Sequence, residues 1–432
     1  MFTTPGSKKG GNPLTIFLFH ESIHSIKRKI PVLVKSIQGN DLNEKPANSF
    51  QDVESFHSSL ARSCDWESVI VYLDNEEGSD TNMESKKTLP EMMFYMPLGT
   101  EVSFCAHAAV GACMAIFMER QNDVFNWSHD KNGAIVKNSD VSISKSHSSV
   151  FPFDMQFTTS KGDHQHSANI LNSNLVELKM TSSLKENDVM LLKKQSMNKS
   201  TENFDPYKIT KELLNEIGLH PEDVAKSNLI TNSHKKSNGF GQMIPRYLNS
   251  SIARTKTLIP ISSLDRLHAA TNPRNKDNFR SLCESIDSTG IYLYSRLEKN
   301  EHDLNANQNS SNLYECRQFP SASGYPEDPA TGIAAAALAA SLHSRKIADI
   351  IFDNNDTRNH NDQLQFDDEA GKYTFYQGTA MQKKSLIQIR FEQLRNDGGV
   401  NHPNSAMISK EKKIDLFCSG FVDIDCKSVL EI

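Results

Sequence analysis

Gly324-Tyr325-Pro326-Glu327-Asp328-Pro329-Ala330-Thr331-Gly332-Ile333-Ala334-Ala335-Ala336-Ala337 is an acidic turn that runs into a row of alanines. Alanine is the best helix former, and Pro329 stands near the first helical turn, where its missing N–H costs least. The sequence therefore predicts a loop followed by a closely packed helix. Asp328 is expected beside the N–H groups of the helix N-terminus, which favour a carboxylate or an oxyanion. The alternative interpretation is that Asp328 only caps the helix.

A second segment has the same shape. It runs from Pro97 to Met114 (PLGTEVSFCAHAAVGACM), after an extended stretch at Met93–Met96, and becomes rich in small residues after a turn. His107 lies where this turn enters the predicted helix, and the positive helix end is expected to hold the imidazole neutral. Two strand–turn–helix units, one with His107 and one with Asp328, predict two pseudo-equivalent halves that face each other. Taken alone, His107 also fits a partly buried histidine with satisfied hydrogen bonds.

Length and composition predict two or three domains that carry polar insertions. The chain has 432 residues, of which 37% are hydrophobic, and its mean hydropathy is −0.51; length sets a soft expectation for the number of domains. The polar excess collects in stretches rich in Ser, Asn, Lys and Asp, which lack periodicity and are expected to be surface insertions. These stretches are residues 75–88, 159–205, 231–254, 298–314, 352–370 and 395–413.

Charge and cysteine content argue against several classes of protein. The net charge of −6 and a pI near 6.2 give no basic footprint for nucleic acid. No apolar run reaches the about 20 residues that a membrane helix needs. The seven cysteines are an odd number without C-x-x-C spacing, which indicates a reducing compartment such as the cytoplasm and no disulfide framework or zinc ribbon. His164 and His166 lie in a polar stretch without a carboxylate at helical spacing, so no metal site is expected there.

Hydrophobic periodicity predicts a mixture of helices and strands, which fits the α+β class. Phe50–Cys64 is amphipathic, with Val53, Phe56 and Leu60 on one face. Further helices are expected at residues 108–119, 209–217, 263–270 and 278–285 and along the alanine run up to residue 342. Strands are expected at residues 11–19, 66–73, 92–96, 133–144, 150–157, 257–261, 290–295, 314–319, 375–377, 386–391 and 414–424.

The two segments resemble motifs of the PhzF-like isomerases, the phenazine-biosynthesis branch of the diaminopimelate-epimerase fold. The stretch from Gly324 is similar to the family's G-x-x-E-D-P-A-T-G-S-A block, with Glu327 through Gly332 in register. Cys105-Ala106-His107-Ala108 is similar to its C-G-H-A-T block. Weaker matches follow in the family's order and span nearly the whole chain, with long inserts between them. They are Gly11-Asn12-Pro13-Leu14, Asp65 to Val71, Arg317-Gln318-Phe319-Pro320, Gln377-Gly378 and Ser419-Gly420.

The resemblance implies a specific version of the α+β class. It has two pseudo-symmetric domains, each a curved, mostly antiparallel sheet wrapped around a central helix, as in diaminopimelate epimerase. Residues 1–158 are expected to form the first domain and residues 159–424 the second, with long polar surface insertions. A C-terminal tail, residues 425–432, is expected to return to the first domain. The resemblance further implies a homodimer with a small carboxylate-bearing metabolite as substrate and no cofactor.

The implied activity is that of an isomerase or epimerase in which Glu67 is the general acid/base, while His107 and Asp328 orient the substrate and assist proton transfer. A carboxylate in a cleft near apolar groups such as Trp66 is also expected to have a raised pKa, which suits that role. The plain alternative for Glu67 is a surface carboxylate at a strand end. The implied substrate-binding residues are Asn12, Ala106, Ala108, Thr331, Gly332 and Ile333, and no metal-binding residue is expected.

Departures from the family motifs keep two other functions open. Ala106 stands where the family has Gly, and Ile333 replaces a serine hydroxyl that would contact the substrate. These changes favour, as an alternative, a catalytically silent protein that retains the fold and binds small acids. Cys105 stands near the position of one of two catalytic cysteines in related racemases. A Cys-dependent racemase is therefore a further alternative, beside the interpretation that Cys105 is merely buried.

Overall fold

The computed structural model describes eleven stretches of the chain: residues 12–19, 53–73, 89–121, 128–129, 135–136, 151–192, 204–225, 246–297, 312–345, 371–395 and 412–422. The predicted C-terminal tail at 425–432 lies outside the described residues. So do the polar stretches 75–88 and 352–370 and most of the strand predicted at 133–144.

The described chain combines helices with a mostly antiparallel sheet, as predicted for an α+β protein. The helices are α2 (Val53–Arg62), α3 (Ala106–Gln121), α4 (Pro206–Glu216), α5 (Leu264–Ala269), α6 (Lys276–Ser285) and α7 (Gly332–Arg345), with 3-10 turns η2 (Val189–Leu191), η3 (Pro221–Asp223) and η5 (Thr379–Met381). The strands are β1 (Thr15–Phe19), β2 (Ser68–Tyr72), β3 (Glu91–Tyr95), β4 (Glu101–Val102), β5 (Ser128–His129), β6 (Ile135–Val136), β7 (Phe153–Thr159), β8 (Gly162–Asn172), β9 (Leu175–Asp188), β10 (Leu248–Ser251), β11 (Lys256–Pro260), β12 (Gly290–Arg296), β13 (Leu313–Pro320), β14 (Lys372–Gln377), β15 (Ser385–Arg395) and β16 (Lys412–Phe421).

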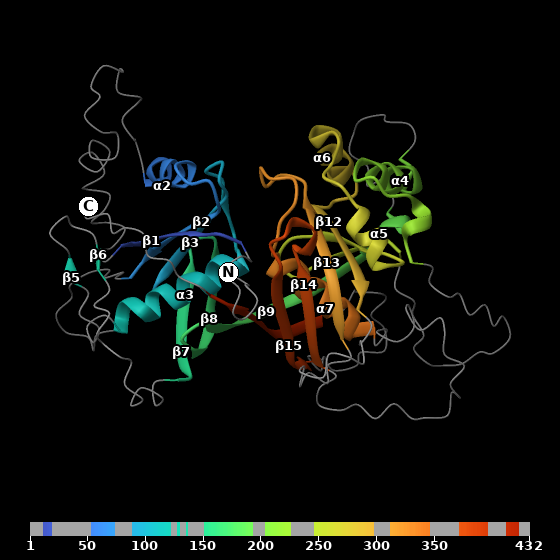
Figure 1. Cartoon of the computed structure of the whole chain (residues 1–432). Helices are drawn as coiled ribbons and strands as arrows, with labels where there is room; N and C mark the ends of the chain where they lie inside the picture. The colour runs from blue at the N-terminus through green and yellow to red at the C-terminus, as the bar shows by residue number, and fades with distance from the viewer. Residues whose placement is uncertain are drawn as a thin grey trace, which may run out of the picture.

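A 14-stranded sheet contains the described strands other than the small β5–β6 pair. Its order is β1-β2-β3-β7-β8-β9-β10-β11-β12-β13-β14-β15-β16, with β4 beside β3. Strand β9 also pairs with β16, so strands β9 to β16 close on themselves. Residues 175–184 of β9 pair with β16, and residues 185–188 pair with β10. In Figure 1, β9 runs between the part that holds α3 and the part that holds α7.

One series of strand pairings occurs twice in the sheet. From β1 to β9 the successive pairs are parallel, antiparallel, parallel, antiparallel and antiparallel. From β11 to β16 the same five relations recur. Parallel neighbours need a crossover connection, and a helix lies in the connection of each parallel pair. In both series the third and fourth strands are joined through a long apolar helix, α3 in the first and α7 in the second.

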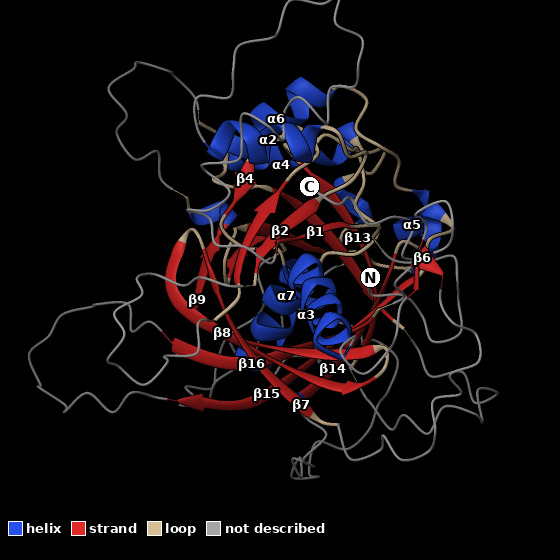
Figure 2. Ribbon diagram, turned by 90° about the vertical axis from the view of Figure 1, so that its left-hand side faces the viewer, coloured by secondary structure: helices blue, strands red, loops and turns tan. Residues whose placement is uncertain are grey.

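The two long helices lie at the centre of the molecule with strands around them (Figure 2). Every residue from Ala334 to Ala340 in α7 is at most 1% exposed, and α3 is similarly buried from Ala108 to Met114. A helix that is apolar all round must be covered on every side. The small side chains let the sheet approach both helices closely, so the close packing expected of the alanine run is confirmed.

The remaining helices cover the outer faces of the sheet. In β11, Leu258 packs in the core around α3 and α7, whereas Ile259 packs with α4, α5 and α6 on the opposite face. This alternation is the period of a strand buried on both sides. Helix α2 covers β1 to β3, and its predicted apolar face, which includes Phe56 and Leu60, is buried there.

The prediction that residues 159–205 form a surface insertion is wrong for most of that stretch. Strands β8 and β9 occupy it and form the middle of the sheet. Val176, Leu178 and Met180 alternate with polar residues and are buried, which is the pattern of a strand with one covered face. The many Ser, Asn and Lys residues of the exposed face concealed it. Strand β10 likewise occupies the end of the predicted insertion 231–254.

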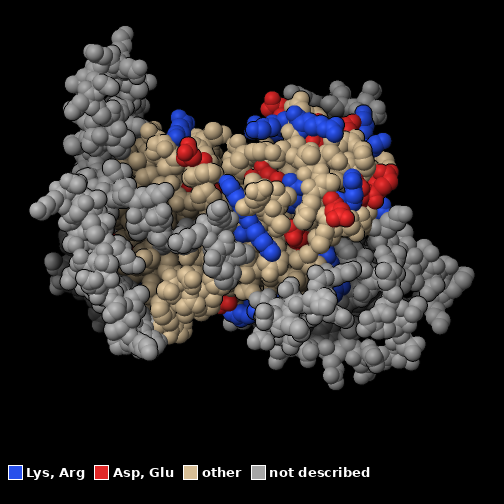
Figure 3. All heavy atoms as spheres, in the orientation of Figure 1, with Lys and Arg blue, Asp and Glu red and all other residues tan. Residues whose placement is uncertain are grey.

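No helix of the described stretches is long and apolar enough to cross a membrane. On the face shown in Figure 3, acidic and basic side chains of these stretches are intermixed.

The turn between β14 and β15 depends on a left-handed glycine. Gly378 has φ +79°, and its carbonyl accepts hydrogen bonds from the amides of Met381 and Lys383. A Cβ atom at Gly378 would lie 2.5 Å from the Lys383 carbonyl oxygen and 2.9 Å from that of Pro329. Neither backbone atom can move without displacing the turn or the loop that carries Asp328.

We expect Gly378→Ala to lower the free energy of unfolding by about 1–3 kcal/mol, because it forces a positive φ on a residue with a Cβ atom. Gly371→Ala is the matched control, since the new Cβ would meet only ordinary contacts at 3.7 Å and beyond. Urea unfolding of both variants measures the difference. Equal midpoints for the two variants would contradict the role of Gly378.

Candidate functional site

Glu67, His107 and Cys105 form a buried chain of contacts in the first half of the molecule. Glu67 directly precedes β2, and His107 is the second residue of α3. The His107 Nε2 atom lies 3.2 Å from Glu67 Oε2, and its Nδ1 lies 3.3 Å from Cys105 Sγ. The three residues are 6%, 3% and 5% exposed. Both nitrogens of the imidazole therefore face a partner, and Glu67 is not the surface carboxylate of the plain alternative.

The loop that carries Asp328 is fixed by a buried ion pair with the strand that precedes it. Arg317 in β13 donates from Nε and Nη2 to the two carboxylate oxygens of Glu327, at 2.8 and 2.7 Å. Its Nη1 donates to the carbonyls of Leu267, His268 and Ala270. Such a fork-to-fork pair fixes direction as well as distance. Glu327 therefore anchors the loop, which leaves the next residue, Asp328, pointing to the other half.

Asp328 is held by donors from three places. Its Oδ1 accepts from Asn12 Nδ2 at 2.7 Å and from the Ala330 amide at 2.9 Å, and its Oδ2 accepts from Thr331 Oγ1 at 2.6 Å. The Ala330 contact is an Asx turn, which shapes the loop before α7 begins at Gly332. Asp328 is thus part of the turn, three residues before the N-cap position of α7, which is Thr331. Asn12 connects it to the start of the described chain.

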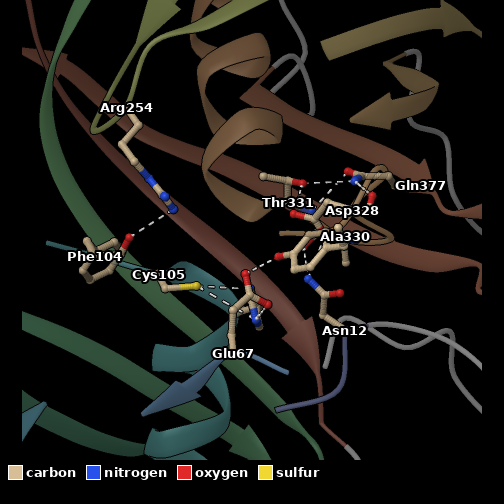
Figure 4. Close-up of polar contacts among 11 residues, drawn as sticks. Asn12, Glu67, Phe104, Cys105, Arg254, Asp328, Ala330, Thr331 and Gln377 are labelled. Carbon is tan, nitrogen blue, oxygen red and sulfur yellow. Dashed lines mark hydrogen bonds and ion pairs between the residues drawn. The ribbon is translucent and has the colours of Figure 1, made fainter. Parts of the chain in front are cut away.

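Gln377, at the end of β14, also holds this loop in place through hydrogen bonds. Its Nε2 donates to the Asp328 carbonyl at 2.7 Å and to Thr331 Oγ1 at 3.1 Å, and its Oε1 accepts from the Thr331 amide at 3.2 Å. Figure 4 shows Gln377, Thr331 and Asp328 grouped in this way, opposite Glu67 and Cys105.

Tyr325, which was not predicted as a site residue, joins the two groups. Its hydroxyl donates to Oε1 of Glu67, although 258 residues separate the two in the chain. The hydroxyl comes from the Asp328 loop, and the carboxylate comes from the strand beside His107. The sequence feature that could have identified Tyr325 is its position inside the acidic turn, three residues before Asp328. From there its long side chain can extend across a site.

The charges of Glu67 and His107 are opposite to those expected from the sequence. Burial opposes ionisation of Glu67, but the charge and hydrogen bond of His107, with the Tyr325 hydroxyl, outweigh it and lower the pKa of Glu67. Burial also opposes protonation of His107, but Cys105 and Glu67 raise its pKa well above 6.5. The predictions of a raised pKa for Glu67 and a neutral His107 are therefore wrong. The paired side chain, rather than the helix end, decides the charge of the imidazole.

The other two acids of the site have raised pKa values. Burial, followed by the negative charge of Glu67, raises the pKa of Asp328. Burial, then the charges of Asp328 and Glu67, raises the pKa of Tyr325 well above 10. Tyr325 therefore remains a hydrogen-bond donor at neutral pH. The site holds one carboxylate that favours its ionised form, Glu67, and one that resists ionisation, Asp328.

A cavity of about 420 Å³ opens beside these groups, and Glu67, Tyr325 and Asn12 form part of its wall. Trp66, which is 43% exposed, lies on the outer wall, and the Lys383 ammonium stands 5.2 Å from the centre of its ring. His107 and Asp328 lie behind this lining and contact Glu67 and Asn12, respectively. The remaining lining residues are Thr271, Asn272, Arg317, Pro326, Glu327, Pro329, Ala380 and Met381.

The expected binding residues at the two helix starts lie close behind this site. Ala106 and Ala108 are buried in the first turn of α3, and Gly332 and Ile333 are buried in the first turn of α7. The Ile333 side chain belongs to the apolar core, so the residue offers only its backbone N–H to a ligand. The first N–H groups of each helix have no partner within the helix.

One set of residues has the chemistry of a metal site. The ligand atoms of Glu67, Cys105 and His107 all lie within 4.8 Å of one another. A thiolate, an imidazole and a carboxylate together suit Zn²⁺. The sequence analysis expected no metal and no cofactor, and that expectation stays a prediction.

Comparisons with known proteins yield a likeness of fold to solved structures. No protein-family model matches the sequence, and no curated protein matches it. The structure is similar to the crystal structure of a phenazine biosynthesis protein of the PhzF family from Bacillus anthracis, with 15% sequence identity and a TM-score of 0.47 over 86% of each chain. At this identity and score the likeness carries no weight for residues or reaction.

The Glu67–His107 pair predicts a pH dependence of stability. Because folding raises the pKa of His107, its contribution is fully present below pH 6.5 and is lost as pH rises through the higher folded-state value. We expect the free energy of unfolding of the natural chain to fall more steeply above pH 6.5 than that of the double variant Glu67→Gln/His107→Gln.

Urea unfolding at several pH values between 6 and 9 measures this difference. The double variant is the reference because replacing His107 alone would leave a buried, unpaired Glu67 with its own titration. Other titrating groups, such as Lys256, are present in both proteins and cancel. Parallel curves would show that the imidazole does not carry the extra proton.

Proposed function

We propose that this protein is a cofactor-independent isomerase or epimerase that moves a proton on a small carboxylate-bearing metabolite. The supporting observation is that Glu67 lines the cavity while His107 holds it on one side and Tyr325 on the other. A buried carboxylate with two hydrogen-bond partners and access to a cavity is positioned for general acid/base work. The motif resemblance to PhzF-like isomerases points to the same residues.

In this proposal Glu67 starts as a carboxylate beside a protonated His107. Glu67 takes a proton from a carbon of the bound acid, and the electron pair of the broken C–H bond passes into the substrate as an enolate. A proton then returns to another carbon, or to the opposite face of the same carbon, from the Glu67–His107 pair or from Asp328. No redox partner is needed, because electrons stay within the substrate. The N–H groups at the start of α3 and α7 offer hydrogen bonds to the enolate oxygen.

The finer architecture belongs to this proposal. We propose that the two series of strand pairings are pseudo-equivalent domains of the diaminopimelate-epimerase type, each built around one long helix. The boundary predicted from the sequence, residues 158/159, differs from that of these two series, because β8 and part of β9 belong to the first one. It remains a prediction, as do the homodimer and the cytoplasmic location. The repeated order of pairings supports the domains, and sedimentation at micromolar concentration measures the assembly.

Glu67→Gln tests the assigned base. The substitution keeps the shape and a hydrogen-bond acceptor for Tyr325 but cannot take a proton. We expect incorporation of solvent deuterium into a panel of unsaturated and cyclic acids by the natural chain, and a loss of at least about 10²-fold in the variant, which is what a positioned base commonly contributes. Mass spectrometry of the recovered acids measures the exchange.

Glu177→Gln is the matched control. Glu177 is also a buried carboxylate, paired with Arg390 at 2.9 Å, but it lies in the sheet away from the cavity. Its variant is expected to exchange at the natural rate. Exchange that survives in Glu67→Gln would remove Glu67 from the mechanism. Binding of acids by the natural chain without any exchange would identify the silent binding protein instead.

The contact of Cys105 with His107 favours a second candidate, the Cys-dependent racemase. A thiol 3.3 Å from an imidazole that is itself held by a carboxylate has the arrangement of an activated nucleophile or base. In that case Cys105 takes the proton from the substrate carbon and returns it, with a second group on the other half. Asp328 is the residue available there.

Cys105→Ala separates the two candidates. If Glu67 is the base, we expect the variant to keep deuterium exchange within about tenfold of the natural rate, because His107 still pairs with Glu67. If Cys105 is the base, exchange falls by about 10²-fold or more, as expected for loss of a positioned acid/base group. Measuring both at equal folded fraction, judged by circular dichroism, keeps the comparison free of stability effects.

A further inference from the structure

Arg254 reaches from the second half of the molecule to the start of α3. It lies between β10 and β11, and its Nη2 atom is 3.5 Å from the carbonyl oxygen of Phe104, two residues before α3 begins. Figure 4 shows the guanidinium on the same side as Cys105 and Glu67 and directed toward them. A side chain from the β10–β11 connection, which was not predicted as a site residue, therefore lies beside the Glu67–His107–Cys105 chain.

The hydrogen-bonding capacity of this guanidinium is largely unused. Its Nε is buried without a hydrogen-bond partner, and the 3.5 Å contact with Phe104 is at the limit of a hydrogen bond. A guanidinium has five N–H donors. Among the described stretches Arg254 makes no ion pair, whereas Arg317, Arg390 and Arg266 each have a carboxylate partner. Arg254 is thus a partly buried cation prepared for an anion.

The surroundings of Arg254 add positive potential. Lys256, two residues along the chain, is 5% exposed, and burial, followed by the charge of Arg254, lowers its pKa to about 7, so it adds only part of a positive charge at neutral pH. The positive charge of Arg254 also acts on Glu67. Beside it, the first N–H groups of α3, a helix of 16 residues, carry the positive end of the helix dipole. The guanidinium of Arg254 and the N-terminus of α3 lie close together at Phe104, and both attract a negatively charged group bound between them.

We propose that Arg254 binds the carboxylate of the substrate, together with the N–H groups at the start of α3. This inference rests on the proposed function only in calling the bound acid a substrate. The anion site itself is inferred from the geometry of Arg254. It narrows the substrate to an acid whose carboxylate adjoins the carbon that faces Glu67. A guanidinium can hold both carboxylate oxygens at once, so it also stabilises the enolate form of that carboxylate when the proton leaves.

Binding of two acids and their neutral amides tests the site. The probes are acetate and benzoate, compared with acetamide and benzamide, and calorimetric titration of the full-length chain measures each affinity. In Arg254→Met we expect affinity for both acids to fall about 10- to 100-fold, as for loss of a charged hydrogen bond, and affinity for the amides to change less than twofold. Arg254→Lys is expected to restore part of the loss, because it keeps the charge without the fork.

Arg280→Met is the matched control. Arg280 also donates to a single backbone carbonyl, that of Ser321 at 3.1 Å, but it is exposed on α6. Its variant is expected to bind the acids as the natural chain does. Equal acid affinity in Arg254→Met and Arg280→Met would overturn the assignment, as would a natural chain that binds acids and amides alike. These results do not depend on catalysis, so failure of deuterium exchange with intact acid binding would refute the proposed reaction and leave the anion site.

Discussion

The backbone ladder along β9 is the constraint on which the remaining architecture depends. This one strand is hydrogen-bonded to β8, β10 and β16, and through them it belongs to both series of strands. Helices α3 and α7 both pack against β9 and β16. Because a shift of register by one residue would turn every side chain of β9 to the opposite face, the position of one central helix fixes that of the other. The start of α3 and the loop before α7 are therefore held opposite each other.

Buried polar contacts then cross between the two parts at the site itself. Asn12 bonds to Asp328, Tyr325 bonds to Glu67, and Arg254 touches Phe104. Each contact removes a polar group from water, which costs free energy unless the partner is in place. The network therefore forms only when both parts have their final arrangement. Assembly of the site therefore requires both parts to be folded and in contact.

The sequence predicts those features that depend on local preference. Both long helices could be recognised because alanine and other small residues favour a helix and close packing. Prediction from the sequence failed for features that depend on contacts between residues far apart in the chain. No residue near His107 in the sequence indicates that Glu67 lies 3.2 Å from its ring. The charge of the imidazole was therefore predicted from the helix end alone. Tyr325 and Arg254 were missed because their contacts join residues more than 100 positions apart. Strand β9 was taken for an insertion because its exposed face carries the polar residues that also mark loops.

The contact between Trp66 and Lys383 has a consequence for how a ligand enters. An exposed cation–π pair contributes about 0.5–1 kcal/mol. The arrangement in which the indole and the ammonium are separated is therefore only about two- to fivefold less populated than the paired one. Diffusion through the outer wall of the cavity is thus barely hindered by this contact. The chain has two tryptophans, and the partly exposed indole of Trp66 lines the cavity. Its emission is a built-in optical signal for following entry in real time by stopped-flow fluorescence.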